Sequence, residues 1–217
     1  MAGRRRGWLV AISLLAAGLG AATAPVGRAR STTMRTGRAT IAIATFGPGV
    51  PASLVERLRP VLEARFEAQV VSAGAVSLPA GAFAPSRAQH RAARLLDELA
   101  RRRRPEWERL LGIADVDLFA PGLNFVFGEA DGDRQVAVFS IARLRGEGDA
   151  AVLERRALVE AVHELGHTYG LEHCPDRHCV MWFSNTLAET DRKGDQFCAR
   201  HEAQLAEVLR TLRDRRR

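Results

Sequence analysis

The segment His163–His173, with the sequence HELGHTYGLEH, limits the structure of this 217-residue chain more than any other feature. Apolar residues at helical spacing precede it, so we expect His163 and His167 to lie on one helix. Because they are four residues apart, they share a face and are close enough to hold one ion. Gly170 is expected to end the helix, since glycine adopts the positive φ found at helix C-termini. The chain can then turn back and bring His173 to the same ion.

Three neutral imidazoles and a water form a tetrahedral zinc site with one exchangeable position. Zinc lowers the pKa of its water and polarises a carbonyl group. Glu164 is rotated about 100° around the helix from His163, so it can approach the open position of the metal without becoming a ligand. We therefore predict that Glu164 acts as the general base. The alternative is a helix that carries two histidines on its surface and binds no metal.

All three cysteines of the chain follow closely, at Cys174, Cys179 and Cys198, and His201 completes a C-x-x-H pair. Three thiolates and one imidazole fit a closed, structural zinc site. We predict that this second zinc ties the loop after the helix to the C-terminal segment. The alternatives are one disulfide beside a free buried cysteine, or a different fourth ligand such as His178.

The rest of the chain alternates between strand and helix patterns. Apolar and β-branched runs predict strands at residues 40–44, 68–71, 116–119, 123–127 and 136–141. Leucine spacing predicts a helix over residues 52–66, kinked or split at Pro60, and a second helix that opens with a capping box from Ser86 to Gln89. A last amphipathic helix follows residue 201. This order predicts a mixed α/β domain over residues 39–217.

The first 38 residues are expected to lie outside this domain. Residues 1–24 combine Arg4, Arg5 and Arg6 with an uncharged apolar run, which is typical of a signal peptide. The arginines also resemble a twin-arginine export signal. The alternative is an uncleaved membrane anchor. Residues 25–38 are expected to be a linker, so we predict an exported protein, periplasmic or extracellular, that contacts a membrane only if residues 1–24 are retained.

The composition excludes several classes of protein but does not by itself indicate a function. With 47% apolar and 26% charged residues, the chain is neither collagen-like, fully disordered nor a polytopic membrane protein. The net charge of +7 could favour a nucleic-acid partner through the runs Arg101–Arg104 and Arg213–Arg217. Both runs end helical patterns, however, where solvated cations suit the helix dipole. We therefore expect no nucleic-acid partner.

This set of residues resembles the archaemetzincins, a branch of the metzincin clan of zinc peptidases. Their pattern is H-E-x-x-H-x-x-G-x-x-H-C, then C-x-M, then C-x-x-C. This chain matches every position of the pattern from His163 to Cys198, including Met181. The chain departs from the pattern at His201, where the family has cysteine. Histidine also binds zinc, so the resemblance implies that the second site is kept. The resemblance extends over residues 40–201.

The resemblance implies a metzincin-like zincin fold. It has a twisted, mostly parallel sheet with one antiparallel edge strand, a long active-site helix and a helical C-terminal part. Leu123–Phe127 is the candidate for that edge strand, along which a peptide would add as a further strand. The resemblance also implies that Met181 forms a turn beneath the three histidines, and that the activity is aminopeptidase-like or that of a restricted endopeptidase.

The predicted function is therefore hydrolysis of peptide bonds by a zinc-bound water that Glu164 activates. We expect two zinc ions per chain, one catalytic and one structural, a peptide or protein substrate and a monomer. The alternative is a zinc-stabilised peptide- or protein-binding module without hydrolytic activity, against which the intact Glu164 argues. Tyr169, the only tyrosine, is either an oxyanion donor or a packing residue.

Overall fold

The computed structural model describes residues 37–217. The predicted signal peptide or anchor at residues 1–24, and most of the predicted linker, lie outside the described residues. Among residues 37–217, none of the helices combines the length and the apolar character needed to cross a membrane.

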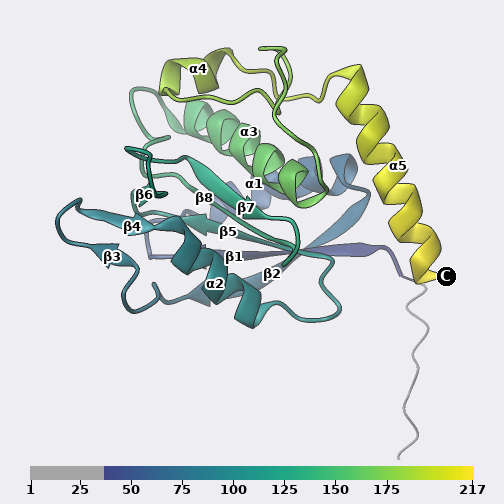
Figure 1. Ribbon diagram of the computed structural model, residues 1–217, viewed down its shortest axis with the longest axis horizontal. Helices are drawn as coiled ribbons and strands as arrows, with labels where there is room; N and C mark the ends of the chain where they lie inside the picture. The colour runs from purple at the N-terminus through teal and green to yellow at the C-terminus, as the bar shows by residue number, and fades with distance from the viewer. Residues whose placement is uncertain (1–36) are drawn as a thin grey trace, which may run out of the picture. The chain divides into compact units, whose positions relative to one another are not determined.

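A five-stranded sheet in the order β2-β1-β5-β8-β7 forms the centre of the fold (Figure 1). Its members are β1 (Ala39–Phe46), β2 (Ala68–Val76), β5 (Arg109–Ala114), β7 (Gly128–Asp131) and β8 (Val136–Ser140). The first three and β8 pair in parallel, whereas β7 pairs antiparallel with β8 at one edge. Strands β5 and β8 are buried on both faces, which explains their almost continuous apolar sequences. The predicted mostly parallel sheet with one antiparallel edge strand is confirmed.

The edge strand lies later in the chain than predicted. Leu123–Phe127 is the loop that precedes β7, and of its residues only Val126 forms an isolated strand bridge. The Arg87 side chain donates hydrogen bonds to two consecutive carbonyls of this loop, at Leu123 and Asn124. Since a side chain occupies these acceptors, they do not join a strand ladder. The aromatic residues that suggested a strand line a wall of the cleft described below.

Strand β5 was not predicted, although it lies at the centre of the sheet. Its apolar run, Leu110–Ala114, is interrupted by Gly112, and glycine is unfavourable inside a strand. Glycine permits close packing there, because a Cβ atom would lie 2.9 Å from the side chain of Leu99 and 3.0 Å from that of Phe46. The glycine that allows this close packing therefore interrupts the strand pattern in the sequence.

A second, smaller sheet consists of β3 (Phe83–Ala84), β4 (Gln89–Arg91) and β6 (Leu118–Phe119), so the strand predicted at 116–119 is only two residues long. The predicted capping box is wrong. Ser86 lies in the turn between β3 and β4, and helix α2 (Ala92–Arg102) begins after Arg91 without a side-chain cap. Gln89 instead donates a hydrogen bond from its side chain to the carbonyl of Asn124.

Helices cover both faces of the large sheet. Helices α1 (Ala52–Arg65) and α3 (Ala150–Thr168) pack on one face and α2 packs on the other (Figure 1). Helix α1 continues through Pro60, so the predicted split is wrong; burial of its leucines offsets the hydrogen bond that proline cannot donate. Helix α3 begins after Asp149, whose carboxylate accepts hydrogen bonds from two backbone N–H groups of its first turn. Helices α4 (Leu187–Arg192) and α5 (Ala199–Arg216) complete the described chain.

Candidate active site

Helix α3 and the turn after it bring three histidines together. His163 and His167 lie one turn apart, with their Nε2 atoms separated by 3.1 Å. Gly170, with a φ of +82°, follows the helix and lets the chain reverse, which places His173 beside them. The three ring centroids are 4.6, 4.7 and 5.4 Å apart. One ligand atom from each ring lies within 4.8 Å of the others, so one metal ion can contact all three.

Backbone carbonyls orient two of these rings. The Nδ1 atom of His163 lies 2.8 Å from the carbonyl oxygen of Val180, and that of His167 lies 2.8 Å from the carbonyl oxygen of Leu171. An Nδ1–H that donates to these carbonyls leaves the Nε2 lone pair free for a metal. Burial lowers the pKa of His163, and it lowers the pKa of His167 to about 4. Both rings are therefore neutral near pH 7, which is the form that binds metals.

Glu164, the predicted general base, is only 4% exposed and lies against β7. Its side chain lies over Gly128, where an added Cβ atom would overlap the carboxylate. Burial raises the pKa of Glu164 well above its ordinary value, and the neighbouring Glu160 raises it further. A carboxylate with a raised pKa is a stronger base, and such groups are typical of sites that transfer protons.

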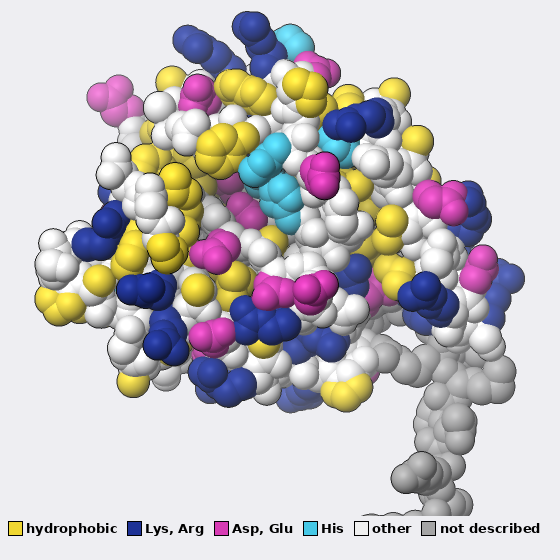
Figure 2. All heavy atoms as spheres, in the orientation of Figure 1, with side chains coloured by type: hydrophobic (Ala, Val, Ile, Leu, Met, Phe, Trp, Pro, Cys, Tyr) yellow, Lys and Arg dark blue, Asp and Glu magenta, His cyan; other side chains and the backbone are white. Residues whose placement is uncertain are grey.

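A cleft of about 280 Å³ opens beside these groups (Figure 2). Residues 122–128 line one side and Phe183–Asn185 line another. Glu160, His163 and Glu164 also line it. Figure 2 shows cyan histidine side chains at the border of a hollow, with magenta carboxylates inside it. The predicted base and His163 therefore line one solvent-accessible cleft, and His167 and His173 line a separate, more open hollow.

The second predicted set of residues also converges. The Sγ atoms of Cys174 and Cys198 are 3.9 Å apart, and Nδ1 of His201 lies 3.4 Å from Sγ of Cys179 and 3.5 Å from that of Cys198. One ligand atom from each of the four lies within 4.8 Å of the others. The three cysteines are free thiols, and His178 is exposed and outside the group. The structure therefore brings the four predicted ligands together and leaves His178 outside the group.

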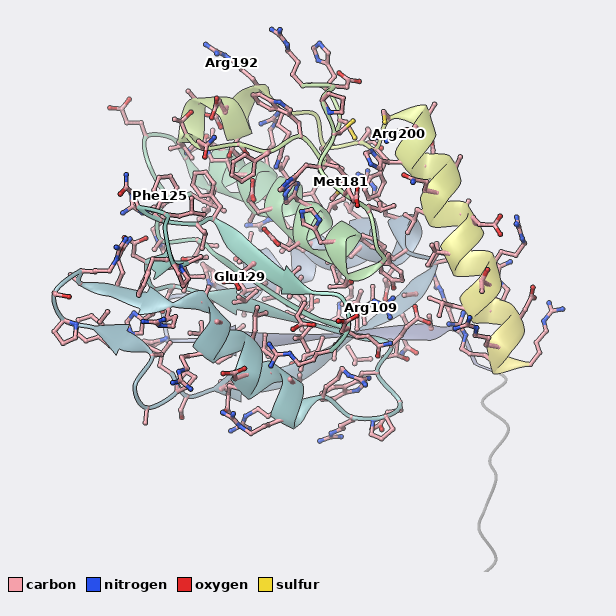
Figure 3. The ribbon with its side chains drawn as sticks, in the orientation of Figure 1. Arg109, Phe125, Glu129, Met181, Arg192 and Arg200 are labelled. Carbon is pink, nitrogen blue, oxygen red and sulfur yellow. The ribbon has the colours of Figure 1, made fainter. Side chains whose placement is uncertain are left out.

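Met181 packs against α3 between the two helical histidines. It is fully buried, and a Cβ atom on Gly166 would lie 2.6 Å from its sulfur atom. The N–H of Cys174 donates a hydrogen bond to the Met181 carbonyl at 2.9 Å, which links this turn to the second cluster. Figure 3 labels Met181 beside α3 and Arg200 in the first turn of α5. Met181 thus lies where the resemblance placed a methionine turn.

Tyr169 is a packing residue. Its side chain is 3% exposed, its ring stacks on Phe66 with 5.2 Å between centroids, and the guanidinium of Arg109 lies 4.0 Å from the ring centroid. Its hydroxyl donates a hydrogen bond to Glu108 at 3.0 Å. These contacts hold the hydroxyl away from the cleft, which excludes it as an oxyanion donor in this conformation.

Two charged residues of the site were not predicted from the sequence. Lys193 is fully buried, with its Nζ atom 3.3 Å from Nδ1 of His163 and 3.3 Å from a carboxylate oxygen of Glu160. Glu160 lies one helical turn before Glu164 and lines the cleft. A signal was present, because Lys193 is the only lysine among 32 lysine and arginine residues. A compact ammonium group occupies this buried position, and a planar guanidinium is not equivalent to it.

Comparison with known proteins identifies the family. A family model described as peptidase family M54 matches residues 50–207. An archaemetzincin from Methanopyrus kandleri is 51% identical over 123 residues, which are 57% of this chain and 69% of that protein. The crystal structure of archaemetzincin from the same organism has a TM-score of 0.74 at 40% identity, covering 79% of this chain and 96% of that one. That of archaemetzincin from Archaeoglobus fulgidus, complexed with malonate, has a TM-score of 0.66 at 35% identity and covers 76% and 99%.

These matches confirm the resemblance drawn from the histidine and cysteine motifs. They also confirm the α/β fold, since the solved structures align with most of the described chain. The chain belongs to peptidase family M54, the archaemetzincins, and is a zinc metallopeptidase.

Proposed function

We propose that this chain hydrolyses peptide bonds in the cleft, with His163, His167 and His173 holding a catalytic zinc ion and Glu164 acting as the base. The observation that carries the proposal is the convergence of three imidazoles, one of which, His163, lines an open cleft together with the buried carboxylate of Glu164. The donor set fits zinc, because the rings are neutral and two of them are oriented by carbonyls. When bound, zinc would polarise the scissile carbonyl and lower the pKa of a water molecule.

Glu164 performs the proton transfers in this mechanism. Its carboxylate takes a proton from the attacking water and then gives it to the nitrogen of the leaving amine. Packing against Gly128 restricts where the carboxylate can move, so it stays beside the histidines. Since Gly128 begins the edge strand β7, a peptide that adds to this edge would bring a carbonyl close to Glu164.

We further propose a structural zinc ion at Cys174, Cys179, Cys198 and His201. Three sulfur donors and one nitrogen donor are the ligands of closed structural zinc sites. The cluster joins the segment after α3 to the first turn of α5. In this role the four residues would hold the segment after α3 and the start of α5 together, and they take no part in proton transfer.

The proposed function is tested by incubating the chain with a peptide library and identifying products by mass spectrometry. We expect cleavage that a chelator abolishes and added zinc restores. His167→Ala should abolish cleavage and lower the bound zinc from two to one per chain, because the second cluster keeps its ligands. If the fully metallated chain binds peptides but cleaves none, the binding-module alternative replaces this proposal.

A second prediction concerns Gly128. The change Gly128→Ala should lower kcat/KM by about 100-fold, because a methyl group there displaces the Glu164 carboxylate, and misplacing a reacting group by about 1 Å has an effect of that order. Zinc content should stay unchanged, since no zinc-site donor is touched. The matched control is Gly37→Ala, because a Cβ atom at Gly37 meets nothing within 4 Å. Equal activity of both variants would show that Glu164 is not constrained by β7.

A further inference from the structure

A second large cavity, of about 550 Å³, lies at the end of the molecule where the described chain begins. Four arginine side chains line it: Arg38, Arg213, Arg216 and Arg217. Apolar residues, among them Phe66 and Leu209, also line it and are at least 95% buried. We call this cavity the arginine pocket. None of its residues belongs to the peptidase cleft or to the cysteine cluster.

The fold gathers these arginines at one place. Parallel strands β1 and β5 begin at the same edge of the sheet, and the last turn of α5 lies beside the start of β1 (Figure 1). Arg213 forms an ion pair with Glu67, and Arg216 forms one with Glu108, so both side chains are oriented. Glu67 is the only acidic residue that lines the pocket. Two of the four arginines are thus paired with a carboxylate, and Arg38 and Arg217 leave the pocket with an excess of positive charge.

The pocket combines a cationic rim with apolar walls. Guanidinium groups bind phosphate oxygens through paired N–H donors. Apolar walls beside them favour a ligand whose anionic group is attached to a hydrocarbon part. A phospholipid headgroup with the start of its acyl chains has both features, whereas inorganic phosphate uses only the rim.

The N-terminal sequence indicates that the anionic ligand of this pocket belongs to a membrane surface. Gly37 lines the pocket, so residues 1–36 join the fold there. They include an apolar run over residues 8–24 that contains no charged residue. A single apolar segment and a basic patch are the two signals that together bind a protein stably to an anionic membrane. The peptidase cleft has a different lining, which includes residues 122–128 and part of α3, so the pocket and the cleft are separate sites.

We propose that the arginine pocket and the last turn of α5 bind the headgroups of anionic phospholipids at a membrane surface. This assignment concerns where the enzyme acts and is independent of the peptidase mechanism. It predicts a salt-sensitive preference for anionic bilayers that belongs to these arginines and not to the overall positive charge of the chain.

The test uses the full chain and sedimentation with vesicles of phosphatidylcholine alone or mixed with phosphatidylglycerol. The triple variant Arg213→Gln, Arg216→Gln and Arg217→Gln should bind the anionic vesicles about 100-fold more weakly, since each basic residue at such a surface contributes about fivefold. Binding to phosphatidylcholine alone should not change. The matched control replaces three exposed arginines outside the pocket, Arg94, Arg177 and Arg192, by glutamine and should retain most of the preference.

A second variant tests whether the effect of the triple variant comes only from losing the two ion pairs. Arg38→Gln with Arg217→Gln keeps the pairs to Glu67 and Glu108 and should still weaken anionic binding about 30-fold. The proposal is wrong if the pocket and control variants lose the preference equally. It is also wrong if inorganic phosphate or duplex DNA binds to the pocket arginines while vesicle binding is the same in all variants.

Discussion

Replacing Glu164 by glutamine is expected to lower kcat for peptide cleavage by roughly 10²–10⁴-fold, the range that a positioned general base contributes. Glutamine has the same shape and can keep the packing against Gly128, but its amide cannot take a proton from water. The change leaves all seven proposed zinc ligands in place. The loss should therefore appear in kcat, while KM changes little.

The control for this variant is Glu172→Gln. Glu172 lies within the same motif, next to His173, but its side chain is exposed and does not line the cleft. Both variants should bind two zinc ions per chain, measured by elemental analysis, and should melt at similar temperatures. If Glu164→Gln retains full activity with both metals bound, Glu164 is not the base. If native chain and variant are equally inactive but bind peptide equally well, the chain is a binding module.

Much of this site could be predicted because its spacing is local. His163, Glu164 and His167 lie on one helix, whose geometry alone places them, and Gly170 can be recognised as the helix end from its residue type. The position of His173 follows from that turn. The cysteine cluster was predictable for a different reason: thiols and imidazole in one short stretch point to a metal, even though Cys198 is far along the chain.

The errors have a common origin in tertiary contacts. The strand that contains Gly112 is missing from the prediction, and the loop 123–127 is predicted as a strand. The neighbours that explain both, Leu99, Phe46 and Arg87, come from other elements. Lys193 is the same case. It lies 30 residues after His163 in the sequence, and only the folded chain places it against that ring. The sequence shows that Lys193 is the only lysine, but this does not indicate which residues it contacts.

The second large effect concerns the cysteine cluster. Cys179→Ser should lower the bound zinc from two to one per chain and destabilise the fold by on the order of 5 kcal/mol, part of the about 10–16 kcal/mol that structural zinc contributes in small domains. Cys179 is fully buried, and burial raises its pKa to about 11, so without a metal it stays a neutral thiol. For a chain of this size the expected fall in Tm is about 10–20 °C.

Three further variants separate the ligands from their neighbours. His178→Ala, adjacent to Cys179 but exposed and outside the cluster, should keep both zinc ions and the native Tm. His201→Cys should also keep both, because it restores the cysteine of the family pattern, whereas His201→Ala should behave like Cys179→Ser. Loss of zinc on His178→Ala but not on His201→Ala would show that the fourth ligand was assigned wrongly.

The remaining alternative is a disulfide, for which Cys174 and Cys198 are the candidates because their Sγ atoms are 3.9 Å apart. Thiol titration of the unfolded chain distinguishes the two states, since the zinc site yields three free thiols and the disulfide yields one. A hydrogen bond from the backbone of His201 lowers the pKa of Cys198, which favours the thiolate that a metal binds. Because Cys198 and His201 both belong to the start of α5, losing the metal should loosen that helix first. Hydrogen exchange of α5 should therefore rise in Cys179→Ser well before the sheet is affected.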